Sequence, residues 1–139
     1  MAFEKISINA TLDAPIDRAW EVYTDPDHIT RWNFASDDWC CPSAENDLRV
    51  GGKLKSRMEA KDGSFGFDFE GTYTDLEPGK SMTYVMEDGR AVTTSFTDLG
   101  AGKTEVNTVF DAESENSTEM QRDGWQAILD NYKRRVEGS

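Results

Sequence analysis

The sequence predicts an α+β fold in which a curved antiparallel β-sheet wraps around a long C-terminal α-helix. Two observations support this prediction. Apolar and polar residues alternate through a first segment, residues 3–12, and through a series of segments between residues 53 and 110, which turn residues separate. From about residue 117 to residue 136 the apolar residues recur instead at helical spacing.

The N-terminal third predicts one strand followed by two short helices. The inward face of the strand over residues 3–12 is formed by Ile6, Ile8, Ala10 and Leu12. Asp13 and Pro15 then predict a helix start, with a capping carboxylate and a proline in the first turn. The buried face of this helix is formed by Ile16, Ala19, Trp20 and Tyr23. Asp25 is expected to cap a second helix that ends near Arg31.

Residues 33–52 are less regular. Trp39 fits a short extended segment, whereas residues 42–47 are polar and predict a loop. Gly51 and Gly52 mark a bend before the main series of strands.

Predicted hairpin turns separate the strands of this series. Gly63 follows Asp62 in a turn that needs positive φ, and Asp88-Gly89 is a strong hairpin signal. Further turns are predicted at residues 77–80 and 100–102. The inward positions between these turns are Leu54, Ser56, Met58, Ala60, Phe67, Phe69, Gly71, Tyr73, Met82, Tyr84, Met86, Val92, Thr94, Phe96, Val106, Thr108 and Phe110.

The C-terminal helix is expected to cover the apolar face of the sheet. Thr118 and Gln121 have the spacing of a capping box at its start. Its apolar stripe is formed by Met120, Ile128, Leu129, Tyr132 and Val136. A helix of about twenty residues is roughly 30 Å long, which matches a strand of about nine residues. One such helix can therefore lie across the whole sheet.

Composition restricts the classes of partner. The chain has 139 residues, which suits one domain over residues 1–139, and a net charge of −12. An acidic surface of this kind repels nucleic acids and anionic membranes. The sequence shows neither a membrane-spanning apolar stretch nor a signal peptide, so a cytoplasmic location is expected. Cys40 and Cys41 are adjacent, and we expect both to be free thiols.

Several motifs together resemble those of a known superfamily. The relevant segments are residues 15–20, residues 25–32 with their closing tryptophan, residues 47–52 (DLRVGG), residues 71–73 (GTY), and Gly124-Trp125 with Leu129 and Tyr132. The chain resembles the helix-grip fold of the START-like (SRPBCC) superfamily, which includes birch-pollen-allergen-like proteins and polyketide cyclases. The branch to which it is most similar contains homologues of the heat-shock-protein-90 ATPase activator.

The resemblance implies one START-like ligand-binding domain with a deep cavity between helix and sheet. Members of the superfamily bind lipids, sterols, hormones or polyketides, and a minority catalyse cyclisation or dehydration. The resemblance therefore implies an apolar small-molecule ligand as the partner, and it leaves a homodimer open.

The candidate cavity residues are mainly aromatic and methionine side chains at inward positions. They are Trp32, Phe34, Met58, Phe67, Phe69, Tyr73, Tyr84, Met86, Phe96, Trp125, Ile128 and Leu129. The alternative is that the same residues form a packed core. A cavity is favoured by the inward hydroxyls of Tyr73 and Tyr84, by adaptable methionines, and by Gly71 and Gly124, which remove side chains between sheet and helix.

Three further patterns suggest a functional site at first, but each is better explained without one. Residues 100–104 (GAGKT) resemble the end of a phosphate-binding loop, but a strand follows where that loop needs a helix, so a hairpin turn is predicted. Residues 116–118 (NST) match a glycosylation acceptor and are interpreted as the start of the last helix. His28 and the two cysteines match no zinc-ligand spacing. No metal and no cofactor are therefore predicted.

Three functions remain open at this point, of which binding without catalysis is favoured. The first is a carrier or sensor of an apolar molecule. The second is a cyclase- or dehydratase-type enzyme, for which an inward carboxylate such as Asp98 or Glu113 would be the base. The third is a co-chaperone-like protein-interaction module.

Overall fold

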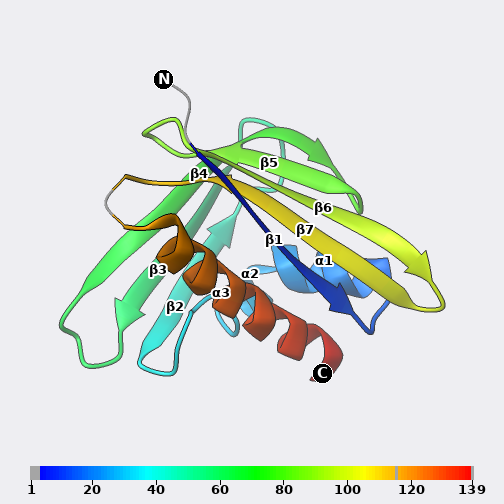
Figure 1. Ribbon diagram of the computed structural model, residues 1–139, viewed down its shortest axis with the longest axis horizontal. Helices are drawn as coiled ribbons and strands as arrows, with labels where there is room; N and C mark the ends of the chain where they lie inside the picture. Colours follow the sequence, from blue (N-terminus) through cyan, green and yellow to red (C-terminus); the bar gives the residue numbers. More distant parts are fainter. Residues whose placement is uncertain (1–3, 115, 139) are drawn as a thin grey trace.

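The structure of the protein is a computed structural model that describes residues 4–114 and 116–138. It confirms the predicted α+β class, with a curled antiparallel sheet of seven strands packed against a long C-terminal helix (Figure 1). In chain order the elements are β1 (Lys5–Leu12), α1 (Ile16–Thr24), α2 (Pro26–Ile29), β2 (Trp39–Asn46), β3 (Lys53–Ala60), β4 (Gly66–Glu77), β5 (Ser81–Val85), β6 (Ala91–Gly100), β7 (Lys103–Asp111) and α3 (Thr118–Gly138).

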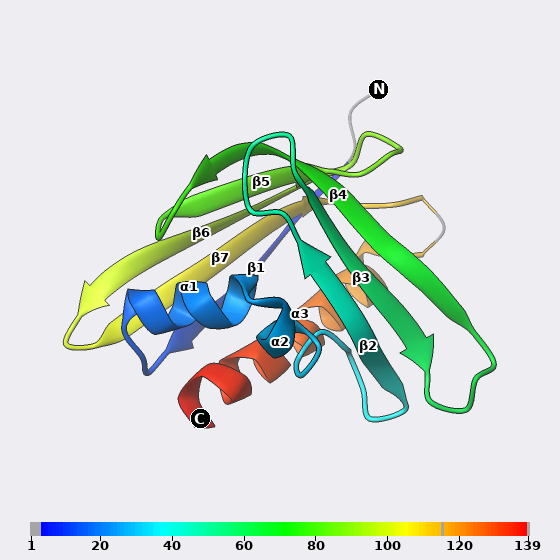
Figure 2. The same ribbon diagram turned by 180° about the vertical axis from the view of Figure 1, so that it is seen from behind.

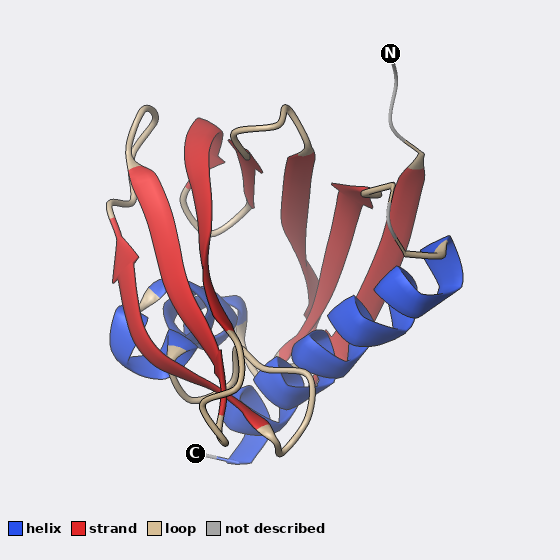
Figure 3. Ribbon diagram, turned by 90° about the vertical axis from the view of Figure 1, so that its left-hand side faces the viewer, coloured by secondary structure: helices blue, strands red, loops and turns tan. Residues whose placement is uncertain are grey.

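The order of the strands explains why the sheet can enclose a space. The sequence of neighbours is β1-β7-β6-β5-β4-β3-β2, and every pair is antiparallel. Strands β1 and β2 therefore form the two edges, although only α1 and α2 lie between them along the chain. Figure 2 shows these two helices crossing from one edge toward the other. Figure 3 shows the curled sheet with α3 running along the β1 side.

The strand alternation was predicted correctly where one face is fully buried. Residues of β1 alternate between exposed and buried along its whole length, with the four predicted inward residues buried. In β6, Val92, Thr94 and Phe96 are buried as expected, and so are Val106, Thr108 and Phe110 in β7. This pattern follows from a sheet whose concave face packs on the core while its convex face meets water.

The segment 100–102 forms the predicted hairpin turn between β6 and β7. Gly100, Ala101 and Gly102 all have positive φ, at 83°, 54° and 74°. Since β7 follows this turn, the turn does not lead into the helix N-terminus that a phosphate-binding loop needs.

Strand β2 corrects the prediction of a loop over residues 42–47. This strand spans Trp39–Asn46 and pairs with β3, with a bulge between Cys40 and Ser43. Because β2 is an edge strand, Pro42 at the bulge removes no ladder hydrogen bond from a second neighbour. The polar composition reflects one solvent-facing edge. Both cysteines are free thiols, as predicted.

The helix caps agree with prediction at α2 and differ at the other two helices. The Asp25 side chain accepts a hydrogen bond from the backbone N–H of Asp27 at 2.9 Å. Asp13 does not cap α1, because Pro15 is the N-cap residue. At α3 the cap is Ser117, whose Oγ accepts the N–H of Met120 at 3.1 Å. The predicted capping box of Thr118 is therefore wrong by one residue.

The stripe of α3 is also shifted from the prediction at its start. Met120 is 62% exposed, whereas the adjacent Gln121 is 8% exposed. The Gln121 side chain holds the preceding loop, because its Nε2 donates to the backbone oxygens of Glu113 and Asn116, and its Oε1 accepts the Glu113 N–H. These hydrogen bonds satisfy the amide of Gln121 in its buried position.

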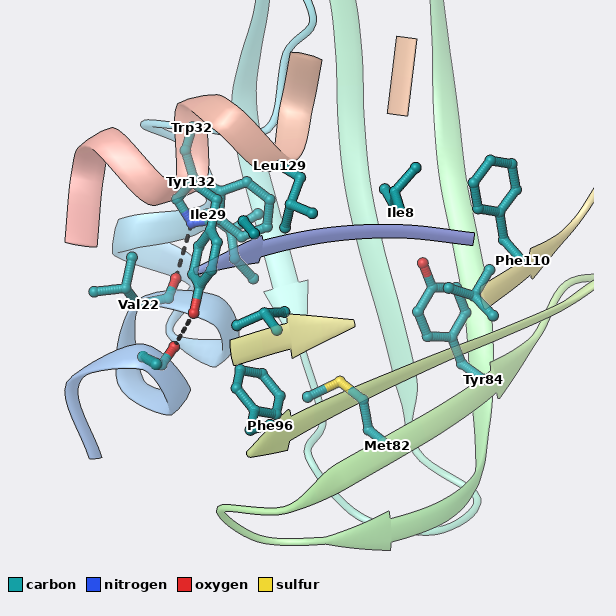
Figure 4. Close-up of a cluster of buried hydrophobic side chains, with 14 of the residues drawn as sticks. Ile8, Val22, Ile29, Trp32, Met82, Tyr84, Phe96, Phe110, Leu129 and Tyr132 are labelled. Carbon is teal, nitrogen blue, oxygen red and sulfur yellow. Dashed lines mark hydrogen bonds between the residues drawn. The ribbon is translucent and has the colours of Figure 1, made fainter. Parts of the chain in front are cut away.

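An aromatic cluster joins α1, α2 and the C-terminal half of α3 (Figure 4). The ring of Tyr132 contacts Tyr23 edge-on at a centroid distance of 5.1 Å and Trp32 at 5.2 Å. The indole N–H of Trp32 donates to the Val22 carbonyl at 2.8 Å, and the Tyr132 hydroxyl donates to the Ala19 carbonyl. This cluster closes one end of the space between sheet and helix. None of the helices in the described part of the chain combines the length and apolar character needed to span a bilayer.

Candidate functional site: a cavity between the sheet and the last helix

A cavity of about 350 Å³ lies between the concave face of the sheet and α3. Its wall is formed by residues from eight of the elements, which are β1, α1, α2, β3, β4, β5, β7 and α3. Four further residues of the wall, Trp32, Asn33, Arg90 and Glu113, lie in connecting segments. The lining residues are Ile8, Tyr23, Ile29, Trp32, Asn33, Leu54, Ser56, Met58, Phe67, Phe69, Tyr84, Arg90, Thr108, Glu113, Trp125, Ile128 and Leu129. Most of these side chains are apolar.

The structure brings together eight of the residues that the sequence singled out. These are Trp32, Met58, Phe67, Phe69, Tyr84, Trp125, Ile128 and Leu129. The other four lie outside the wall. Tyr73, Met86 and Phe96 are buried in the packed core. Phe34 is half-buried in the connection after α2, where its carbonyl accepts a hydrogen bond from the Asn131 side chain.

Cross-strand register explains the wall formed by β3 and β4. Met58 pairs with Phe67 and Ser56 pairs with Phe69. Directly paired residues in an antiparallel ladder point to the same face of the sheet. One correct assignment of the inward face in β3 therefore determines which side chains of β4 face the cavity.

Trp125 forms the helix side of the wall. Its indole is stacked on the Phe110 ring at a centroid distance of 4.0 Å and an interplanar angle of 12°. It also contacts the Phe69 ring edge-on, at 6.1 Å. Because these two partners belong to β7 and β4, Trp125 connects α3 to both sides of the curled sheet.

Gly71 clears space for a tyrosine of the neighbouring strand rather than for α3. A Cβ atom at Gly71 would lie 2.3 Å from Cδ2 of Tyr84, closer than real Cβ contacts. Gly124 was predicted to remove a side chain where the sheet and the helix would otherwise touch, with close packing as the alternative. Both explanations are wrong, because a Cβ at Gly124 would meet nothing within 4 Å.

The hydroxyl groups predicted to face inward have different surroundings. The Tyr73 hydroxyl donates to Oδ1 of Asn46 at 2.7 Å, so the protein itself satisfies it. The Tyr84 hydroxyl has no hydrogen-bond partner among the described residues, and because none of their fully buried side-chain oxygens is unpartnered, this oxygen is not fully buried although the residue as a whole is only 4% exposed. In Figure 4 this hydroxyl points away from β5 in the direction of Ile8, another lining residue. Burial raises the pKa of Tyr84 well above its ordinary value.

Charged and exposed groups mark the place where the cavity meets the surface. Phe67 lines the cavity yet is 41% exposed, and it forms an aromatic cluster with Trp39 and Phe65 at centroid distances of 6.0–6.1 Å. Arg90 lines the wall with its Nε bonded to Asp88 at 2.6 Å. Glu113 lines it half-buried, with Oε1 accepting the Asn116 N–H at 2.7 Å.

The two carboxylates considered as inward bases are thus placed differently. Glu113 reaches the cavity wall. Asp98 is exposed near the end of β6, where its side chain accepts the Gly100 N–H at 2.8 Å. A turn residue bonded in this way stabilises the hairpin and does not face the cavity.

Sequence reasoning missed a second group of lining residues. Ile8, Leu54, Ser56 and Thr108 occupy predicted inward positions, so the strand alternation could have included them. Ile29 and Tyr23 had only a helical pattern as a signal. Asn33 and Arg90 lie in connecting segments, for which no sequence periodicity predicts a direction.

All four tyrosines of the chain are held in a form that resists ionisation. Burial raises the pKa of Tyr23, Tyr73, Tyr84 and Tyr132 above the ordinary 10.0. The raised pKa values favour the folded state fully below pH 10, and this contribution is lost as the pH rises above 10. We therefore expect no tyrosinate absorbance in the folded protein near pH 10, followed by alkaline unfolding together with ionisation. Ultraviolet absorbance and circular dichroism measured on the same samples check this, and a tyrosinate signal near pH 10 without unfolding would contradict it.

Comparison with known proteins places the chain in a family. Residues 13–137 match the family described as Activator of Hsp90 ATPase homolog 1-like protein. The solution NMR structure of the AHSA1-like protein from Aeromonas hydrophila is 47% identical, with a TM-score of 0.90 over 97% of this chain and 93% of that one. A solution structure from Cytophaga hutchinsonii is 40% identical, with a TM-score of 0.83 over 96% and 92% of the two chains.

A crystal structure from Chromobacterium violaceum, 26% identical, has a TM-score of 0.86 over 96% of this chain and 98% of that one. No curated protein matches. The family match covers most of the sequence, and the two more similar structures have the same fold over nearly their whole length. The chain therefore belongs to the Activator of Hsp90 ATPase homolog 1-like family of the START-like (SRPBCC) superfamily.

Proposed function

We propose that the protein binds an apolar small molecule in the cavity between the sheet and α3, without transforming it. The observation that carries this proposal is the cavity itself, about 350 Å³ in volume and lined mostly by apolar side chains. Small-molecule sites are commonly apolar hollows of roughly 300–1,000 Å³ with a few polar groups. A packed core of this size would not leave such a space, since protein interiors are packed almost as densely as crystals.

The volume limits the size of the ligand. At roughly 30 Å³ for each non-hydrogen atom, as in liquid water, the cavity holds about a dozen such atoms. The rings of Phe69, Trp125 and Trp32 provide flat walls, which favour a compact aromatic or alicyclic molecule over a long chain. A ligand of two fused rings has about the right size.

Binding is favoured over catalysis because of the state of the one carboxylate at the wall. Among the described lining residues, Glu113 is the only carboxylic acid, and its Oε1 already accepts a backbone N–H of the loop before α3. A general base must be within hydrogen-bond reach of the proton it takes. Glu113 is engaged with its own loop, so the arrangement supports holding a ligand and offers no prepared acid–base pair.

A cavity-filling substitution tests the proposal. Leu54→Trp adds an indole to the cavity wall, so we expect it to lower the affinity for 2-naphthol at least tenfold. Leu99→Trp makes the same change at a residue that is 50% exposed, and it should bind like the wild type. Equilibrium dialysis gives the affinities, and thermal unfolding shows whether each variant is folded. Equal binding by the two folded variants would contradict the proposal.

A further inference from the structure

The four tyrosine hydroxyls differ in one respect that concerns the ligand. The hydroxyls of Tyr23, Tyr73 and Tyr132 are bonded to Thr94, Asn46 and the Ala19 carbonyl. The hydroxyl of Tyr84 has no such partner within the described residues, and its ring lies at the cavity wall. None of the fully buried side-chain oxygens and nitrogens of the described residues lacks a partner, so the Tyr84 oxygen must reach the open space of the cavity. Its hydrogen bond can therefore be supplied by a molecule other than the protein.

The Tyr84 ring is held in place and cannot turn to find a partner elsewhere. The side of the ring that carries Cδ2 lies against the backbone at Gly71, where a Cβ atom would come within 2.3 Å of Cδ2. The Phe69 and Tyr73 rings contact it edge-on at centroid distances of 6.0 and 6.2 Å. The hydroxyl therefore keeps one direction, which is the preorganisation that a hydrogen bond to a ligand needs.

The other polar side chains of the wall are already engaged. Tyr23 and Thr108 are linked through Thr94, at 3.1 and 3.0 Å. Burial raises the pKa of the Cys41 thiol, and hydrogen bonding from the side chains of Ser56 and Asn33 opposes that rise, so both side chains are directed at the thiol. Among the described lining residues, Tyr84 thus offers a ligand the one hydroxyl that has no partner on the protein.

The charges at the wall indicate an uncharged ligand. Arg90 and Glu113 each have a partner of their own, in Asp88 and the Asn116 N–H. A charged ligand group buried in the cavity would have no free counter-charge, and burial of an unpaired charge is far more costly than burial of a neutral polar group.

We infer, building on the proposed function, that Tyr84 is a ligand-binding residue whose hydroxyl hydrogen-bonds a single oxygen of an uncharged, otherwise apolar molecule. The ligand class is a compact ring compound with one hydroxyl or carbonyl group. The hydroxyl of Tyr84 can donate to a carbonyl oxygen or bond to a hydroxyl, because it stays protonated over the neutral pH range.

The experiment compares two probes of nearly equal shape, 2-naphthol and 2-methylnaphthalene, by equilibrium dialysis at about pH 7. The wild type is expected to prefer 2-naphthol by roughly tenfold, the value of one hydrogen bond of about 1.4 kcal/mol. Tyr84→Phe should remove this preference by weakening 2-naphthol binding alone. Tyr73→Phe, the same change at a hydroxyl that the protein satisfies, should keep the preference.

The melting temperature without ligand is a second measurement, and it distinguishes a ligand-binding role of Tyr84 from a purely structural one. Tyr84→Phe removes an unpartnered hydroxyl, so its melting temperature should equal or exceed that of the wild type, whereas Tyr73→Phe should lower it. If the wild type binds both probes equally, or if Tyr84→Phe keeps the preference, the role of Tyr84 is overturned and the proposed function stands. If the wild type binds neither probe, both are overturned.

Discussion

Replacement of Tyr132 by alanine is expected to destabilise the protein by about 3–5 kcal/mol, the usual cost of removing a buried aromatic ring. Tyr132 is fully buried, its ring packs between Tyr23 and Trp32, and its hydroxyl bonds to the Ala19 carbonyl. The substitution leaves a hole where α3 meets α1 and α2. Urea unfolding followed by circular dichroism measures the loss.

The control for this prediction lies on the same helix. Met120 belongs to the same sequence-predicted stripe but is 62% exposed, so Met120→Ala should change the unfolding free energy by no more than about 0.5 kcal/mol. Tyr132→Phe keeps the ring and removes one hydrogen bond, at a cost of about 1 kcal/mol. Similar losses for Tyr132→Ala and Met120→Ala would show that this cluster does not anchor α3.

Most of the fold could be predicted because its strands have one face in the core and one in water. In β1 the side chains of Ile6 and Ile8 are buried while their neighbours are exposed, so the period of two is visible in the sequence. The prediction was wrong for β2, an edge strand whose bulge interrupts the alternation at Pro42. A strand that lacks a regular buried face carries no such signal.

The start of α3 shows a different limit. The sequence pattern selects Met120 by its apolar character, whereas the structure buries Gln121. Gln121 is buried because its amide satisfies backbone groups of the loop after β7, at Glu113 and Asn116. A polar side chain with such local partners is stable in the interior, and periodicity alone does not reveal those partners.

The sequence predicts which types of residue form the candidate site, but it does not predict which individual side chains face the cavity. Inward alternation selected both Tyr73 and Tyr84, yet only Tyr84 lines the cavity. The difference depends on Asn46, which reaches the Tyr73 hydroxyl from β2, a strand that the sequence did not predict at that residue. Which hydroxyl remains available to a ligand is thus decided by a tertiary contact.

The second large effect is expected from Gly71→Ala, which should destabilise the protein by about 1–3 kcal/mol and also weaken ligand binding. The added methyl group would lie 2.3 Å from Cδ2 and 3.0 Å from Cγ of Tyr84. These atoms are close to the backbone of Tyr84, so a small rotation at the end of the side chain does not relieve the clash. The ring must move toward the cavity, into the volume that the ligand would occupy. Urea unfolding and equilibrium dialysis with 2-naphthol measure the two losses.

Gly124→Ala separates this clash from the general effect of replacing a glycine. A Cβ at Gly124 meets nothing within 4 Å, and Gly124 lies inside α3, where alanine is favoured. Gly124→Ala should therefore stabilise the protein by about 0.4–1 kcal/mol. The opposite signs follow from one cause, because the ring of Tyr84 occupies the space at Gly71 and no atom occupies the space at Gly124. Stabilisation by both substitutions would mean that the Tyr84 ring is free to move, and its hydroxyl would then lose the fixed direction on which recognition of a ligand oxygen depends.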